Sequence, residues 1–234
     1  MEVETIDAPR TPVRLEPASI GALKFEIQDD VPEGTRIKVI GVGGAGCNAV
    51  SRMFRQGIRG VDFYVVNTDR QALAASPVPN KLLIGHRVTG GLGAGSDPAM
   101  GKEAAMESTS EILEILDGAQ MVFVAAGMGG GTGTGAAPMI ASWAREMNAL
   151  TVAIVTTPFG FEGSRRKRIA DRGLEELADT VDTLIRVPNE KLKSLAPKGT
   201  PLTQAFQMDD SVLDKDVSGI ADLVNNACLW HRDF

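Results

Sequence analysis

Short apolar runs alternate along the chain with longer segments in which apolar residues recur every three or four positions. The runs span residues 36–40, 62–66, 81–84, 121–126, 150–155 and 183–187, and their length is typical of buried β-strands. The clearest segments with helical spacing are 132–146 and 164–177. Asp97 and Pro98 predict a further helix start, with Glu103, Glu107 and Glu111 on the solvated side of that helix. The pattern therefore predicts six strands interleaved with helices.

Strands that alternate with helices predict an α/β fold, a doubly wound and mainly parallel sheet flanked by helices. A last apolar pattern, from residue 201 to 224, predicts one long core helix, or a short helix joined to a longer one. Residues 1–34 carry four prolines among charges and show no sustained period, so we expect a mobile extension. The remaining residues, 35–234, are expected to form the folded domain.

Composition narrows the class of protein. With 234 residues, of which 43% are hydrophobic, the chain can bury a substantial core. A formal charge of −6 argues against a nucleic-acid or membrane-surface binder, and the basic cluster at 165–168 is better explained as the solvated face of a helix. Two cysteines make no disulfide framework, and no apolar run has the length of a membrane span. We expect a cytoplasmic protein without direct membrane insertion.

Residues 127–135, GMGGGTGTG, have the composition of a phosphate-binding loop. Six of these nine residues are glycine, and the run lies between an apolar strand and a predicted helix. Such a turn points successive backbone N–H groups toward one place, and the helix N-terminus adds its dipole. The run therefore predicts an anion site for a di- or triphosphate, in preference to a flexible linker.

Two further glycine clusters follow other strands. Gly41, Gly43 and Gly46 satisfy G-x-G-x-x-G, and Asp69 follows a little over twenty residues later, as in dinucleotide-binding enzymes. That match alone is weak, because any tight strand-to-helix turn over a phosphate requires similar glycines. The second cluster spans 90–95. We expect all three glycine loops at the carboxyl edge of the sheet.

Six motifs occur in order: GVGGAGCNAV at 41–50, VNTD at 66–69, GLGAG at 91–95, GGGTGTG at 129–135, PFGFEG at 158–163 and DTLIRVPNEKL at 182–192. In this series the chain resembles the GTPase domain of the tubulin/FtsZ family. The resemblance implies a Rossmann-like GTPase that binds GTP or GDP, with Mg²⁺ held through the phosphates and no metal ligand assigned to the protein. It also implies head-to-tail self-association into filaments of a bacterial division ring at mid-cell, and adaptor proteins as partners.

The resemblance assigns residues to the phosphates and to the nucleoside. The phosphate group comprises Gly43, Gly44, Asn48, Gly93, Ala94, Gly95, Gly129, Gly130, Gly131, Thr132, Gly133 and Thr134, with Asn67 and Asp69 at the same edge. Glu162 and Arg166 resemble a ribose-side pair, although an ordinary surface ion pair would look the same. Asn189 would contact the nucleoside, Phe206 would stack on the base or lie in the core, and Asp210 would accept hydrogen bonds from guanine.

The chain departs from the family pattern near its end. In the family, a loop with two acidic residues follows the core helix and positions the attacking water in the next subunit's site. Here Asp233 matches the first acid, whereas the second acid, the C-terminal domain and its adaptor-binding tail are missing. We therefore expect a truncated chain that hydrolyses GTP weakly or not at all on its own.

Two other functions are compatible with parts of the sequence. An NAD-dependent Rossmann enzyme would explain residues 41–46 and Asp69, but it leaves the runs at 91–95 and 127–135 without a purpose. A nucleotide-binding, non-hydrolytic protein that caps or regulates a full-length polymer would explain both the glycine loops and the incomplete catalytic loop.

Overall fold

The computed structural model describes residues 36–188. The extension 1–34, the core helix predicted at 201–224 and four predicted site residues lie outside this range; the four are Asn189, Phe206, Asp210 and Asp233. Statements about them remain predictions.

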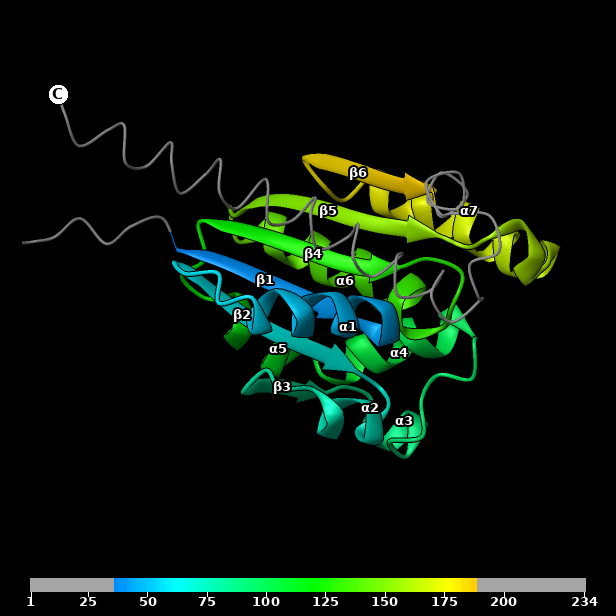
Figure 1. Ribbon diagram of the computed structural model, residues 1–234, viewed down its shortest axis with the longest axis horizontal. Helices are drawn as coiled ribbons and strands as arrows, with labels where there is room; N and C mark the ends of the chain where they lie inside the picture. Colours follow the sequence, from blue (N-terminus) through cyan, green and yellow to red (C-terminus); the bar gives the residue numbers. More distant parts are fainter. Residues whose placement is uncertain (1–35, 189–234) are drawn as a thin grey trace, which may run out of the picture. The chain divides into compact units, whose positions relative to one another are not determined.

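Six strands form one sheet in which every neighbouring pair is parallel, in the order β3-β2-β1-β4-β5-β6 (Figure 1). The strands are β1 (Ile37–Val42), β2 (Val61–Asn67), β3 (Asn80–Leu83), β4 (Met121–Gly127), β5 (Leu150–Thr157) and β6 (Thr183–Pro188). The doubly wound parallel fold and all six strands are thus confirmed, with bounds shifted by one or two residues. The central strands β1, β4 and β5 are buried along nearly their whole length, and such strands appear in the sequence as continuous apolar runs.

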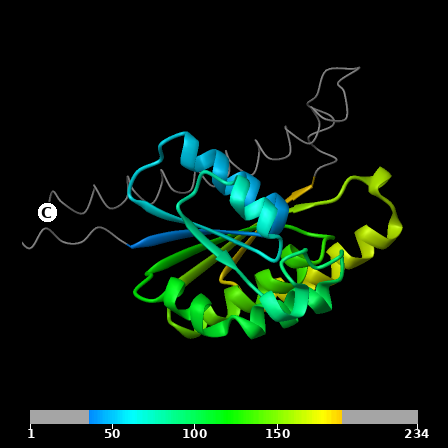
Figure 2. The same ribbon diagram turned by 90° about the horizontal axis from the view of Figure 1, so that it is seen from below.

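Helices cover both faces of the sheet. They are α1 (Gly43–Arg55), α2 (Arg70–Ala75), α3 (His86–Thr89), α4 (Pro98–Glu107), α5 (Thr109–Leu116), α6 (Thr132–Glu146) and α7 (Ser164–Ala178), with a short 3₁₀ turn at Gly160–Glu162. In Figure 2, α1 lies on one face and the green and yellow helices of α4 to α7 lie on the other. Within residues 36–188, no helix combines the length and the apolar character that crossing a bilayer would need.

The side chains of each strand alternate between two buried clusters. Phe123 and Ala125 of β4 belong to the cluster on the α1 face, whereas Val122 and Val124 belong to the cluster under α4 to α7. At the start of β1, the buried Lys38 ammonium donates to the carbonyl oxygens of Ile115 (2.8 Å) and Asp117 (2.6 Å). Lys38 therefore satisfies the carbonyl groups at the end of α5, which have no partner inside the helix.

The segment after Pro98 differs from the sequence prediction. Glu103, Glu107 and Glu111 were expected on one solvated helix face, but the helix is interrupted at Ser108 and the Glu107 side chain is only 15% exposed. The Glu107 carboxylate accepts hydrogen bonds from the backbone N–H groups of Arg87 (3.0 Å) and Val88 (3.1 Å), and these, with the Arg87 bond first, lower the pKa of Glu107. Glu107 thus caps the start of α3, a short helix that the sequence pattern did not predict.

Candidate functional site

The order of the strands creates a crevice at one point of the carboxyl edge. β1 and β4 are neighbours, but α1 leaves β1 toward one face and α6 leaves β4 toward the other. In open α/β sheets a ligand binds where the winding reverses in this way. A cavity of about 470 Å³ lies at this point, and its described lining is Gly44, Ala45, Asn48, Gly127, Met128, Gly130, Gly131, Thr132, Gly133, Thr156, Pro158, Glu162 and Arg166.

Two long helices begin at the cavity. Gly44 and Ala45 belong to the first turn of α1, and Thr132 and Gly133 open α6. The first N–H groups of a helix have no partner within it and carry a partial positive charge. Gly43 lets the two helix starts approach each other, because its φ is +72° and a Cβ there would come within 2.8 Å of the Gly133 nitrogen. The floor of the cavity is therefore suited to an anion.

The run 127–135 is divided between lining the cavity and closing the loop. Gly130, Gly131, Thr132 and Gly133 line the cavity. The N–H of Gly129 donates to the Thr134 hydroxyl at 2.9 Å, and Thr134 is buried. Gly129 and Thr134, which were predicted to face the phosphates, close the loop on itself through this hydrogen bond. A direct contact of either residue with phosphate stays a prediction.

The loop after β2 supports the glycine run from behind. The Asn67 amide oxygen accepts from the N–H groups of Thr68 (2.8 Å) and Asp69 (3.3 Å). The Asp69 carboxylate accepts from the N–H groups of Gln71 (2.8 Å) and Ala72 (3.1 Å) and so forms the N-cap of α2. Both predicted site residues shape this loop in the structure, and a role for either in nucleotide binding stays a prediction.

The cluster 93–95 lies directly behind the glycine run. A Cβ on Gly131 would come within 2.8 Å of the Ala94 Cβ and 2.9 Å of the Asp97 nitrogen. Ala94 is 6% exposed, and neither it nor Gly93 nor Gly95 belongs to the described lining. Ala94 packs against Gly131, and a direct contact of Gly93, Ala94 or Gly95 with phosphate remains a prediction.

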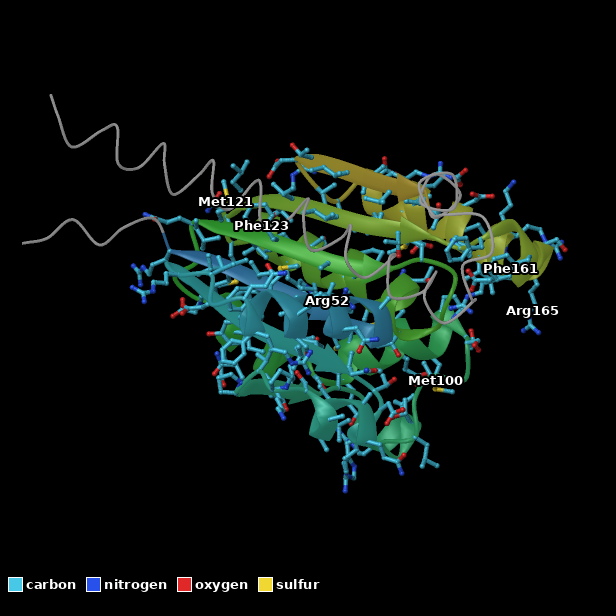
Figure 3. All side chains as sticks on the ribbon, viewed as in Figure 1. Arg52, Met100, Met121, Phe123, Phe161 and Arg165 are labelled. Carbon is cyan, nitrogen blue, oxygen red and sulfur yellow. The ribbon has the colours of Figure 1, made fainter. Side chains whose placement is uncertain are left out.

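Glu162 and Arg166 form one wall of the cavity. Their side chains pair at 2.8 Å, with the Glu162 side chain 10% exposed and the Arg166 side chain 53% exposed. The second oxygen of Glu162 accepts from the Phe159 N–H at 2.7 Å, which fixes the carboxylate on its loop. In Figure 3, Phe161 and Arg165 of this segment lie at the opposite end of the sheet from Met121 at the start of β4. The ion pair thus belongs to the same edge as the glycine loops.

Cys47 lies one turn into α1 and is buried. Burial raises the pKa of its thiol from the ordinary 9.0 to about 12, and contacts with Val66 and Asn67 offset this only in part. The folded chain therefore holds a neutral thiol at pH values where the unfolded chain forms a thiolate.

Two consequences of the raised Cys47 pKa can be measured. In a Cys228→Ser chain, iodoacetamide at pH 9 is expected to modify Cys47 only after unfolding in urea. Since the unfolded chain releases the thiol proton first, this group also lowers the unfolding free energy as pH rises from about 9 to about 12. Rapid labelling of the native chain, with a rate that increases around pH 9, would contradict both.

A second hollow of about 300 Å³ adjoins the first and shares Gly44 and Asn48 with it. Its other described lining comprises Cys47, Ser51, Arg52, Arg55, Ala72, Ala75 and Ser76. The Ser51 and Ser76 hydroxyls lie 2.7 Å apart and join α1 to the end of α2. Asn48 therefore contributes to the lining of both hollows.

Eight of the sixteen predicted site residues within 36–188 line the cavity, and five other residues complete its described lining. Gly44, Asn48, Gly130, Gly131, Thr132, Gly133, Glu162 and Arg166 line one cavity as expected from the motifs. The lining residues that were not named individually as site residues are Ala45, Gly127, Met128, Thr156 and Pro158, of which Gly127 and Met128 open the glycine run 127–135. Four of the five stand at or just beyond the carboxyl ends of β4 and β5, so strand ends were the signal that could have found them.

The fold and the cavity define a Rossmann-like α/β domain with a glycine-lined cavity at its switch point, suited to an anion. The chain belongs to the tubulin/FtsZ family, since the family's GTPase domain matches residues 36–197. It is 50% identical to the cell division protein FtsZ of Pseudomonas putida over 210 residues, which cover 90% of this chain and 53% of that protein. The chain thus spans about half the length of this relative.

Solved structures agree with this assignment. The empty FtsZ dimer of M. jannaschii matches with a TM-score of 0.80 and 45% identity, over 82% of this chain and 55% of that one. The GTPγS-bound protofilament of CetZ2 from Haloferax volcanii matches with a TM-score of 0.73 and 26% identity, over 81% of this chain and 59% of that one. The resemblance stated from the six motifs is therefore confirmed.

Proposed function

We propose that the chain binds GTP and GDP in the cavity between β1 and β4 and that it is the nucleotide-binding part of a filament-forming GTPase. The observation that carries this proposal is the convergence of the α1 and α6 N-termini on a cavity of about 470 Å³ lined by Gly130, Gly131 and Gly133. Backbone N–H groups and helix dipoles can hold a polyphosphate without a cluster of cations. This agrees with the negative formal charge of the chain.

The remaining parts of the nucleotide are assigned by position. The Glu162–Arg166 pair, on the wall beside the glycine loop, is suited to the ribose side, where a carboxylate accepts from hydroxyl groups. Asn189, Phe206 and Asp210 are proposed for the nucleoside and for guanine selection. Within residues 36–188, no group of three or more His, Cys, Asp or Glu could hold a metal ion, and we propose that Mg²⁺ binds through the phosphates.

We further propose that the nucleotide-binding edge meets a neighbouring subunit head to tail, and that the neighbour's acidic residues complete hydrolysis. Support comes from relatives solved as a dimer and as a protofilament, and from the cell-division name of the P. putida relative. Asp233 is the acid that this chain would offer to the next subunit. A division ring at mid-cell, with adaptor proteins, is the setting proposed for the assembly.

The test is GTP binding and turnover by the purified 234-residue chain, alone and mixed with a family member that has both loop acids. Binding by the chain alone with little turnover, and stimulated turnover in the mixture, is the expected result, because positioning of the attacking water needs the neighbour's acids. ATP serves as the control ligand, and equal affinity for ATP would contradict guanine selection. Binding without turnover in either case would favour a non-hydrolytic capping protein, and no binding would contradict the proposal.

A further inference from the structure

Thr68 is bonded to two of the three glycine loops, 90–95 and 129–135. It stands between Asn67 and Asp69 and is fully buried, with 0% of its surface exposed. Its hydroxyl lies 2.7 Å from the hydroxyl of Thr132, which opens α6. Its carbonyl oxygen accepts the N–H of Gly93 at 3.1 Å. Thr68 is thus bonded to the 129–135 loop through its side chain and to the 90–95 loop through its backbone.

A bound anion would decide which of the two hydroxyls, that of Thr68 or that of Thr132, donates the hydrogen bond between them. Each hydroxyl carries one proton, and within the pair only one proton can lie between the two oxygens. Phosphate oxygens without protons only accept, so a Thr132 hydroxyl that meets the phosphate, as its place in the cavity lining allows, gives its proton to the ligand. Thr68 then has to donate to Thr132, and a hydroxyl that accepts a hydrogen bond becomes a better donor itself.

We propose that Thr68 is a positioning residue for phosphate binding, which acts by donating its hydroxyl proton to Thr132; this rests on the proposed nucleotide function. Thr68 cannot touch the ligand, because it is completely buried. The polar side chains on either side of it serve the loop and the N-cap of α2. Of Asn67, Thr68 and Asp69, Thr68 is therefore the residue whose side chain bonds to the 129–135 loop.

The test compares substitutions that keep the shape of Thr68 with substitutions that keep its hydroxyl. Thr68→Val removes the donor and leaves the backbone bond from Gly93 in place, whereas Thr68→Ser retains the donor. Thr151→Val is the matched control: Thr151 is also 0% exposed, and its hydroxyl donates to the Ala149 carbonyl (2.9 Å) at the opposite edge of the sheet. Dissociation constants for GTP, GDP and guanosine are measured with the nucleotide-free 234-residue chain, together with urea unfolding.

Thr68→Val is expected to weaken GTP and GDP binding roughly three- to tenfold, the effect of one hydrogen bond, with Thr68→Ser and Thr151→Val close to the unsubstituted chain. Guanosine, which has no phosphate, is expected to bind all variants equally. In a Thr132→Val background, Thr68→Val is expected to have no further effect, because its partner is gone. Thr68→Ala serves in place of Thr68→Val if the valine variant does not fold.

Three results would overturn the inference. These are unchanged GTP affinity in Thr68→Val, an equal loss for guanosine, and a loss of the same size in the Thr132→Val background. Absence of GTP binding by the unsubstituted chain is a different result, since it would overturn the proposed function and the inference with it.

Discussion

Gly135→Ala is expected to lower the unfolding free energy by about 2–4 kcal/mol, the range of a severe overpacking change in a core. Gly135 lies in the first turn of α6, where α6 packs on α4. A Cβ at this position would overlap the Pro98 carbonyl oxygen and come within 2.7 Å of the Lys102 nitrogen. Both are backbone atoms, so no side chain can move aside and the two helices would have to separate.

Urea unfolding of the purified variant without nucleotide measures this effect. Gly44→Ala is the matched control, because Gly44 is also a helical glycine but a Cβ there would meet no atom within 4 Å. Alanine has the higher helix propensity, so the control is expected to be as stable as the unsubstituted chain or slightly more stable. Equal stability of Gly135→Ala and Gly44→Ala would contradict the packing of α4 on α6 described above.

Gly130→Ala is expected to weaken GTP binding by about tenfold to a hundredfold while the unfolding free energy stays unchanged. Gly130 lines the cavity, and a Cβ there would meet no protein atom within 4 Å. The methyl group would instead occupy space that a phosphate needs to reach the backbone N–H groups. Losing one such charge-assisted hydrogen bond costs about 1.5–3 kcal/mol.

Equilibrium titration with GTP, alongside urea unfolding of the same preparation, checks both parts of the Gly130 prediction. A loss of stability equal to that of Gly135→Ala would mean that Gly130 packs against protein. Full GTP affinity in a stable Gly130→Ala chain would place the phosphates elsewhere and would contradict the assignment of residues 130–133 to the phosphate-binding floor.

The fold of residues 36–188 could be predicted largely from the sequence, because parallel strands buried on both faces appear as continuous apolar runs. Residues 121–126 and 150–155 gave β4 and β5 to within two residues. The short helices α2 and α3 were not predicted, since four to six residues show no period. The capping role of Glu107 was not predicted for another reason: its partners are N–H groups about twenty residues earlier in the chain.

The site was predictable as a set of loops but not as a set of contacts. Glycine-rich motifs marked the edge where Gly130 and Gly131 line the cavity. No sequence pattern shows that the Gly129 N–H is used by Thr134, or that Thr68, between two more conspicuous polar residues, is the one that reaches Thr132. Such assignments depend on which way a backbone group or a hydroxyl turns, and this is decided by packing among segments far apart in the chain.

The all-parallel sheet has a consequence for any assembly of this chain. Its two edges are chemically unlike, with glycine loops and helix N-termini at one edge and strand starts such as the buried Lys38 near the other. If the glycine-loop edge of one subunit met the strand-start edge of the next, the contact would be heterologous and would repeat without closing into a symmetric pair. The two ends of such a row of subunits would differ, because one end would display the open glycine-lined cavity and the other would not. Addition and loss of subunits would therefore proceed at different rates at the two ends.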